Sequence, residues 1–148
     1  MPVPFSGIEK RLEKLKKCLL KLEPLQTKPL SEFETDPYLK DIVERNLEVA
    51  AQCCIDIANR IIALEGFDKP NDAFEAIIRL GEQNILPHDF AKLFAPITGF
   101  RNILIHEYLD IDWKEVYDNL QSLEDFRFYT ESIIRWLEGK IDDSARTI

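Results

Sequence analysis

The stretch from Asp36 to Gly66 constrains the fold of this 148-residue chain more than any other part of its sequence. Asp followed by Pro is a typical helix start, because Asp accepts bonds from free N–H groups and Pro suits the first helical turn. Gly is a typical helix end. Between these positions the apolar residues recur at steps of three and four: Leu39, Ile42, Val43, Leu47, Ala50, Cys54, Ile57, Ala58, Ile61 and Ile62. The sequence therefore predicts one long amphipathic helix.

The N-terminal part of the chain predicts another helix, rich in Lys and Leu. Ser6 with Glu9 three residues later matches a capping box, in which each side chain bonds to the other residue's backbone N–H. We expect this helix to open at Ser6 and to stop at Pro24. Residues 24–35, which contain two prolines, are expected to be a connection.

The C-terminal part is helical by the same criteria, and no alternating strand pattern is present. Three helices are expected here, over residues 72–81, over 87–108 with a kink at Pro96, and over 112–139, before a polar tail at 140–148. Asp with Glu three positions later opens the first and third of them. We therefore predict an all-α, up-and-down bundle of about five helices, two of them long, in a single domain spanning residues 1–148.

Composition excludes several classes of protein. Hydrophobic residues make up 45% of the chain, enough for a core at this length without disulfides or a metal. No run of 18 uncharged apolar residues is present, so we expect no membrane helix. Cys18, Cys53 and Cys54 are typical of buried, reduced thiols, and we expect a cytoplasmic protein. With only two His and no Gly-rich phosphate loop, we expect neither a metal site nor a bound cofactor.

The charge of the chain is unevenly distributed. Lys and Arg number 19 and Asp and Glu 27, for a net charge of −8. The first 30 residues carry a net charge of +4, so the other 118 carry −12. An acidic body argues against a protein that coats nucleic acid through bulk electrostatics. It is compatible with a local basic pocket, and with a partner that has a basic face.

The segment from Gly99 to Asp112 contains the strongest candidate site. On a helix with about 100° per residue, Arg101 falls in the middle of an apolar stripe. The stripe consists of Phe90, Phe94, Ile97, Leu104, Ile105 and Tyr108, with Leu93 and Phe100 just beyond it. Asn102 and His106, four residues apart, share the adjacent face and can act together.

Two interpretations of this segment stay open from residue types alone. In the structural one, Arg101 pairs with a core carboxylate such as Asp56 or Glu48, and His106 is a hydrogen-bonded core imidazole, because a buried polar or charged group is costly without a partner. In the functional one, Arg101 and His106 line a cleft prepared for a phosphate, with Tyr108 at its edge.

The string Arg101-x-x-x-x-His106-x-Tyr108 resembles the signature of the HEPN superfamily, and specifically of its HepT-like toxin branch. Three further parts of the chain are similar to that branch: Arg45–Glu48 with Gln52 and Asp56–Ala58, then Asp72–Leu86, then Gly99–Tyr108 with Asp112 and Tyr117. The resemblance is best over residues 36–137. The spacing of the three motif residues within a helix, together with these flanking matches, favours the functional interpretation.

The resemblance implies a small α-helical homodimer that cleaves RNA without a metal, with Arg101 and His106 as catalytic residues and Asn102 in support. Asn102 would orient His106 or bind a phosphate. RNA cleavage by the 2′-hydroxyl needs a base, an acid and positive charge at the phosphate. Imidazole can serve either proton role, and guanidinium matches two phosphate oxygens. One protomer offers only one histidine here, which favours a two-fold dimer whose interface continues the apolar stripe.

The resemblance also implies a partner. HepT-like toxins are commonly paired with a minimal nucleotidyltransferase antitoxin, which can transfer AMP from ATP to the motif tyrosine, here Tyr108. The added negative charge would oppose entry of the RNA phosphate. We therefore expect this chain to be the toxin ribonuclease of a type II toxin–antitoxin system. The alternative is a non-catalytic helical module that binds a nucleotidyltransferase and helps to position its substrate.

Overall fold

The computed structural model describes residues 5–146 and, within them, the side chains as far as residue 143. The described chain forms eight α-helices and one short 3-10 helix, and it contains no strand. The elements are α1 (Ser6–Leu22), η2 (Glu23–Leu25), α2 (Leu30–Thr35), α3 (Pro37–Glu65), α4 (Ala73–Glu82), α5 (His88–Phe94), α6 (Ile97–His106), α7 (Trp113–Leu120) and α8 (Leu123–Arg146). The all-α class is confirmed, with more helices than the five expected.

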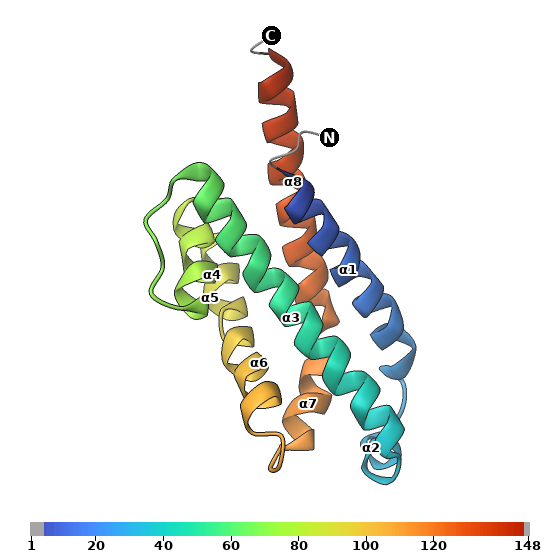
Figure 1. Ribbon diagram of the computed structural model, residues 1–148. Helices are drawn as coiled ribbons and strands as arrows, with labels where there is room; N and C mark the ends of the chain where they lie inside the picture. Colours follow the sequence, from blue (N-terminus) through green and yellow to red (C-terminus); the bar gives the residue numbers. More distant parts are fainter. Residues whose placement is uncertain (1–4, 147–148) are drawn as a thin grey trace.

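Helix α3 runs through the middle of the fold and contacts α1, α2, α4, α6 and α7 (Figure 1). Helix α1 lies antiparallel along one side of it. Both predicted ends of α3 are confirmed. The Asp36 carboxylate accepts hydrogen bonds from the backbone N–H groups of Tyr38 and Leu39, and Gly66 closes the helix in the left-handed region, with a φ of 70°. Helix α3 is the element against which the candidate site is built.

A cluster of buried apolar side chains draws on all eight α-helices. Tyr129 of α8 is fully buried and donates its hydroxyl to the backbone carbonyl of Cys54 at 2.7 Å, and burial raises the pKa of that hydroxyl. Cys18, Cys53 and Cys54 are free and buried, and burial raises the pKa of the Cys53 thiol to about 11. These thiols pack as small apolar residues, as expected.

The N-terminal part differs from expectation in two places. Helix α1 opens at Ser6 as expected, but Phe5 and not Ser6 occupies its N-cap position. The connection expected over residues 24–35 contains helix α2, because Phe33 is fully buried there and stacks on Trp113 with ring centroids 5.1 Å apart. An apolar anchor therefore holds this segment in place.

The helix expected over residues 72–81 is confirmed as α4, which ends one residue later, but Gly81 is not the left-handed residue that follows it. Gly81 lies inside the helix and is buried against α5, where a Cβ at this position would come within 2.5 Å of the Ala91 Cβ. Glycine is needed here because the two helices approach so closely. The chain turns instead at Asn84, which has a φ of 60°. The start of this helix is confirmed, since the Asp72 carboxylate accepts from the Glu75 N–H at 2.8 Å.

Residues 87–108 form two helices rather than one kinked helix. Helices α5 and α6 separate at Pro96, which has no N–H to continue the helical bonding. Helix α6 then ends at His106, so Tyr108 lies in the turn before α7. The placement of Tyr108 on a helix face with Arg101 is therefore wrong.

The helix expected over residues 112–139 is also two helices, α7 and α8. Asp112 caps α7 as expected. The break between the two helices is bonded to the N-terminal part of the chain: the Gln26 side chain donates to the Leu120 carbonyl, and the Gln121 side chain donates to the Gln26 carbonyl, both at 2.9 Å. A contact between distant segments therefore accompanies the end of α7.

Helix α8 is longer than expected. It continues past Gly139, so the predicted polar tail is helical as far as Arg146, and residues 147–148 lie outside the described part of the chain. Its last turns project beyond the end of the bundle (Figure 1). None of the helices in the described part combines the length and the apolar character that crossing a bilayer requires.

Candidate functional site

Arg101 lies in the middle of α6, where this helix meets α3. Its neighbours Phe100 and Leu104 are buried and hold α6 against the core. The guanidinium is half-buried: Nη1 donates to Oε1 of Gln52 at 2.6 Å, and Nη2 donates to Oδ1 of Asn102. Nε is fully buried and has no hydrogen-bond partner among the described residues. Both acceptors of this cation are therefore uncharged amides.

Gln52 extends this contact into a chain of polar side chains, which we call the Arg101 network: Arg101, Gln52, Asp56 and Arg11. Nε2 of Gln52 donates to Oδ1 of Asp56 at 2.8 Å, and Oδ2 of Asp56 lies 3.5 Å from Nε of Arg11. Arg11 also donates from Nη1 to the Gly7 carbonyl at 3.0 Å. The network joins α6, α3 and α1. At the α1 end of the network, the Asp56 carboxylate is paired with Arg11.

Neither carboxylate considered as a partner for Arg101 pairs with it. Asp56 pairs with Arg11, and Glu48 forms an ion pair with Arg45 at 2.8 Å. The guanidinium therefore has no carboxylate partner among the described residues. Each of its terminal nitrogens uses one N–H on an amide, and the other N–H has no acceptor within the described chain. Phosphate oxygens accept hydrogen bonds from such free N–H groups of an arginine.

His106 is the last residue of α6, five positions after Arg101, which places it about 7.5 Å further along the helix axis. Its side chain is exposed and makes no hydrogen bond or ion pair with any other residue that the structure describes. The interpretation of His106 as a core imidazole is therefore wrong. Asn102, expected to orient His106 or bind a phosphate, instead accepts a bond from Arg101.

Tyr108 lies in the turn after α6 with 70% of its surface exposed. Together with Lys40, Asp41 and Glu44 of α3, among others, it lines a hollow of about 300 Å³. The charged side chains of this hollow are two acids and one base, so its net character is acidic. The turn therefore presents the tyrosine hydroxyl to solvent, two residues beyond His106.

Half of the apolar stripe predicted around Arg101 is buried in the chain's own core, whereas Leu93 near its N-terminal end is 62% exposed. Its buried members are Phe94, Ile97, Phe100 and Leu104. The expectation that the stripe continues into a dimer interface is wrong for these four residues. Exposed apolar side chains are found at its C-terminal end and in the next turn: Ile105 at 38%, Tyr108 at 70% and Leu109 at 85%.

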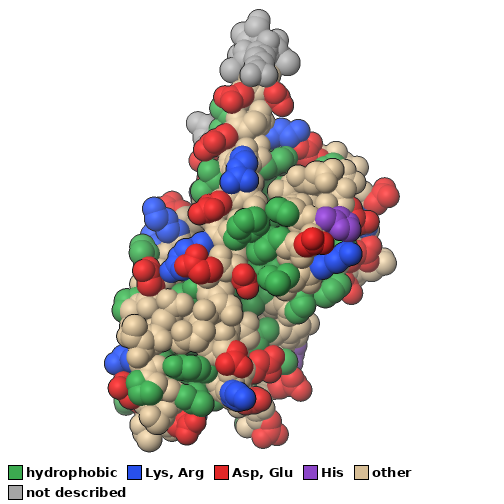
Figure 2. Space-filling model, turned by 180° about the vertical axis from the view of Figure 1, so that it is seen from behind, with side chains coloured by type: hydrophobic (Ala, Val, Ile, Leu, Met, Phe, Trp, Pro, Cys, Tyr) green, Lys and Arg blue, Asp and Glu red, His purple; other side chains and the backbone are tan. Residues whose placement is uncertain are grey.

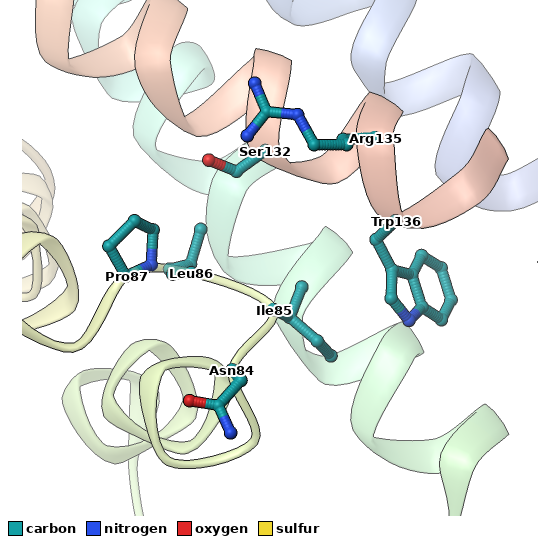
Figure 3. Close-up of a pocket in the computed structure, with 7 residues that line it drawn as sticks. All are labelled: Asn84, Ile85, Leu86, Pro87, Ser132, Arg135 and Trp136. Carbon is teal, nitrogen blue, oxygen red and sulfur yellow. The ribbon is translucent and has the colours of Figure 1, made fainter. Parts of the chain in front are cut away.

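Other surfaces of the described chain have fewer features of a catalytic or binding site. Figure 2 shows acidic side chains over much of one face, with basic side chains scattered among them. A hollow of about 320 Å³ between α8 and the loop after α4 includes Arg135 and Trp136, and none of its lining residues belongs to the Arg101 network (Figure 3). No three His, Cys, Asp or Glu side chains in the described part are grouped to hold a metal ion. The candidate site is therefore α6 with its contacts on α3.

Gln52 is the site residue that sequence reasoning missed as a contact of Arg101. The signal was present: Gln52 is a polar residue within the otherwise apolar run Ala50–Ile55, four positions before Asp56. Residues four apart share one face of a helix. The sequence therefore indicated that Gln52 and Asp56 lie together, but not that α6 brings Arg101 to them.

The profile of a family described as "Ribonuclease HepT-like" matches residues 8–133. The chain is 34% identical over 131 residues to a protein named "tRNA nuclease HepT" from Aphanizomenon flos-aquae, a match that covers 88% of this chain and 89% of that protein. It is 27% identical over 124 residues to "mRNA nuclease HepT" from Shewanella oneidensis, covering 83% and 92% of the two chains.

Among solved structures, the fold is similar to that of a Shewanella oneidensis HEPN toxin, described as tri-AMPylated and in complex with an MNT antitoxin. The TM-score is 0.79 and the sequence identity 26%. The superposition covers 88% of this chain and 98% of the toxin chain. The likeness therefore extends over nearly the whole fold.

Proposed function

Because this chain belongs to the family of HepT-like ribonucleases, we propose that it is the toxin ribonuclease of a type II toxin–antitoxin pair. We propose that it cleaves RNA without a metal ion, and that Arg101 and His106 are the catalytic residues. The observation that carries this proposal is the state of Arg101, whose guanidinium is held by two neutral amides rather than by a carboxylate.

Arg101 supplies positive charge to the scissile phosphate. When RNA is cleaved by its own 2′-hydroxyl, the 2′-oxygen forms a bond to phosphorus while the bond from phosphorus to the 5′-oxygen breaks. Negative charge gathers on the remaining phosphate oxygens during this step. A cation already held in position stabilises that charge without reorganising, and removal of one such group typically slows a reaction by about 10²–10³.

His106 supplies the proton transfer. One imidazole can take the proton of the 2′-hydroxyl or give a proton to the leaving 5′-oxygen, but the two tasks together suit two imidazoles. We propose that a second copy of the chain provides the other one in a two-fold dimer. The exposed apolar side chains of Ile105 and Leu109, on either side of His106, support an interface at this end of α6.

A nucleotidyltransferase antitoxin is the proposed protein partner, with Tyr108 as the residue that receives AMP. Tyr108 is exposed, and a structural relative is described as a tri-AMPylated toxin bound to an MNT antitoxin. The acidic surroundings of Tyr108, with Asp41 and Glu44 in the same hollow, suit a partner with a basic face. AMP attached here would add negative charge two residues beyond His106 and oppose entry of the RNA phosphate.

The test is RNA cleavage by purified variants. His106→Ala and Arg101→Ala should each lower the rate of tRNA or mRNA cleavage by about 100-fold or more, and each should relieve growth inhibition. Cleavage by the unaltered chain should persist in EDTA. His88→Ala is the matched control, because His88 is the other histidine and is exposed on α5, outside the site. It should cleave as the unaltered chain does.

The opposite results are informative. Full activity of a folded His106→Ala protein would exclude the proposed mechanism, and loss of activity in EDTA that returns with Mg²⁺ would exclude metal independence. If the unaltered chain cleaves no RNA yet binds a nucleotidyltransferase tightly, the chain is the non-catalytic module considered above.

A further inference from the structure

We infer that Gln52 and Asp56 are positioning residues that hold the Arg101 guanidinium in place while leaving its charge uncompensated. This inference rests on the proposed role of Arg101 and adds the part of the fold that prepares it. Gln52 acts as a neutral spacer between a cation and a carboxylate, and Asp56 sets the direction in which the spacer points. Neither residue touches the reacting phosphate.

The neutral spacer is the first step of the argument. A half-buried arginine in a helical protein is ordinarily compensated by a carboxylate. Here the acceptor on α3 is Oε1 of Gln52 at 2.6 Å, and the carboxylate of Asp56 lies behind it, bonded to Nε2 of the same amide. The amide therefore fixes the guanidinium by a hydrogen bond but does not cancel its charge.

The direction of the amide is the second step. A Gln side chain can present either its oxygen or its NH₂ group, and only the oxygen accepts a bond from arginine. Because the Asp56 carboxylate can only accept, it holds the NH₂ group of Gln52 on its own side at 2.8 Å and turns the oxygen toward Arg101. Without that carboxylate, the amide would be able to turn its NH₂ group toward the cation.

The charge order along the network is the third step. Arg11 lies 3.5 Å from Asp56, so the only carboxylate of the network is paired at the α1 end. Read from α1 to α6, the charges are positive, negative, neutral and positive. The uncompensated charge therefore stands at Arg101, on the helix that carries His106.

A charge swap tests this order. The double variant Gln52→Glu with Asp56→Asn keeps the size of both side chains, the net charge and a hydrogen bond between the two positions. It places the carboxylate directly against Arg101 and the amide behind it. Because Arg11 and Asp56 form a partly exposed pair, the loss of that pair should affect folding little, and the melting temperature reports this.

The swap should lower kcat/KM for cleavage of bulk bacterial tRNA by about 100-fold, similar to the removal of one charge-stabilising donor. Binding of the same tRNA, measured with His106→Ala as the background, should weaken. The slope of log Kd against log salt should fall by about one, because one phosphate contact is lost. A purely structural role of Gln52 would not change that slope.

A matched control moves the same charges outside the network. Asn59→Asp on α3 with Glu13→Gln on α1 likewise leaves the net charge unaltered, and both residues are exposed. It should cleave and bind tRNA as the unaltered chain does. If the charge swap fails to fold, Gln52→Met replaces it, since Met has a similar length but cannot accept the bond. Gln52→Met should lower kcat/KM about tenfold. Added to Arg101→Ala, it should not lower kcat/KM below the value of Arg101→Ala alone.

The outcomes separate this inference from the proposed function. If Arg101→Ala abolishes cleavage while the folded charge swap, or Gln52→Met, cleaves tRNA normally with an unchanged salt slope, the inference is overturned and the proposed function stands. If Arg101→Ala itself cleaves normally, the proposed role of Arg101 falls, and this inference falls with it.

Discussion

The two ends of the α6 site are built differently. Arg101 in the middle of the helix is half-buried, flanked by the buried Phe100 and Leu104, and bonded to two amides. His106 and Tyr108, only five and seven residues later, are exposed. Their side chains form no hydrogen bond or ion pair with any other described residue. The difference teaches that the cation is prepared by the fold of one chain. In the proposed function, the groups that act with the histidine and the tyrosine come from outside this chain.

Mixed dimers would test this difference between Arg101 and His106 most directly. Chains carrying Arg101→Ala and chains carrying His106→Ala should each be inactive, yet a mixture with exchanged subunits should cleave RNA about tenfold faster than either one. The reason is that a shared cleft would contain one intact guanidinium and one intact imidazole. The measurement is cleavage after subunit exchange, with exchange followed by native mass spectrometry. A mixture that forms mixed dimers but gains no activity would show that the cleft is not shared or that one guanidinium and one imidazole do not suffice.

Replacement of the exposed tyrosine would sharpen the other half of the comparison. When the unaltered chain is produced with its nucleotidyltransferase and ATP, its mass should rise by whole AMP units and its cleavage activity should fall several-fold, because the added negative charge opposes entry of the RNA phosphate. Tyr108→Phe should gain no mass and stay active. Tyr38→Phe is the control, because Tyr38 is the other highly exposed tyrosine, at 80%. Neutralisation of Tyr108→Phe as efficient as that of the unaltered chain would show that the partner inhibits by binding alone.

The smallest expected effect is on stability. Arg101→Ala leaves the Gln52 oxygen without its donor inside the fold, so the free energy of unfolding should fall by about 1–2 kcal/mol. His106→Ala should change it by less than about 0.5 kcal/mol, because an exposed side chain without partners is removed. Urea unfolding at a fixed protein concentration measures both. Equal losses for the two variants would mean that Arg101 is no more tightly held than His106.

The prediction from sequence was best where the determinants lie within a few residues of one another. Asp36 and Gly66 end α3 as expected, because a cap and a left-handed glycine act on the backbone next to them. The same holds for Asp72 at the start of α4. The spacing of Arg101, His106 and Tyr108 is also a property of the chain, and this spacing by itself places the three residues in one short segment.

Tertiary structure decided what those local patterns could not. Gly81 is needed where α4 meets Ala91 of α5, and the chain contains no local sign of that meeting. Helix α6 ends at His106 without a nearby glycine or proline. The chain instead turns to bring Trp113 to Glu44, whose carboxylate accepts its indole N–H at 2.8 Å.

The partner of Arg101 was decided in the same way. Sequence by itself determined that a cation in an apolar helix face needs an acceptor, because an unpaired buried charge is costly. Asp56 and Glu48 were reasonable choices, but packing of α6 on α3 places the Gln52 amide at the guanidinium instead. Which side chain meets another across 49 positions of sequence depends on how two helices pack. The sequence therefore determined which reactive side chains the site contains, and the fold determined which groups balance the charge of Arg101.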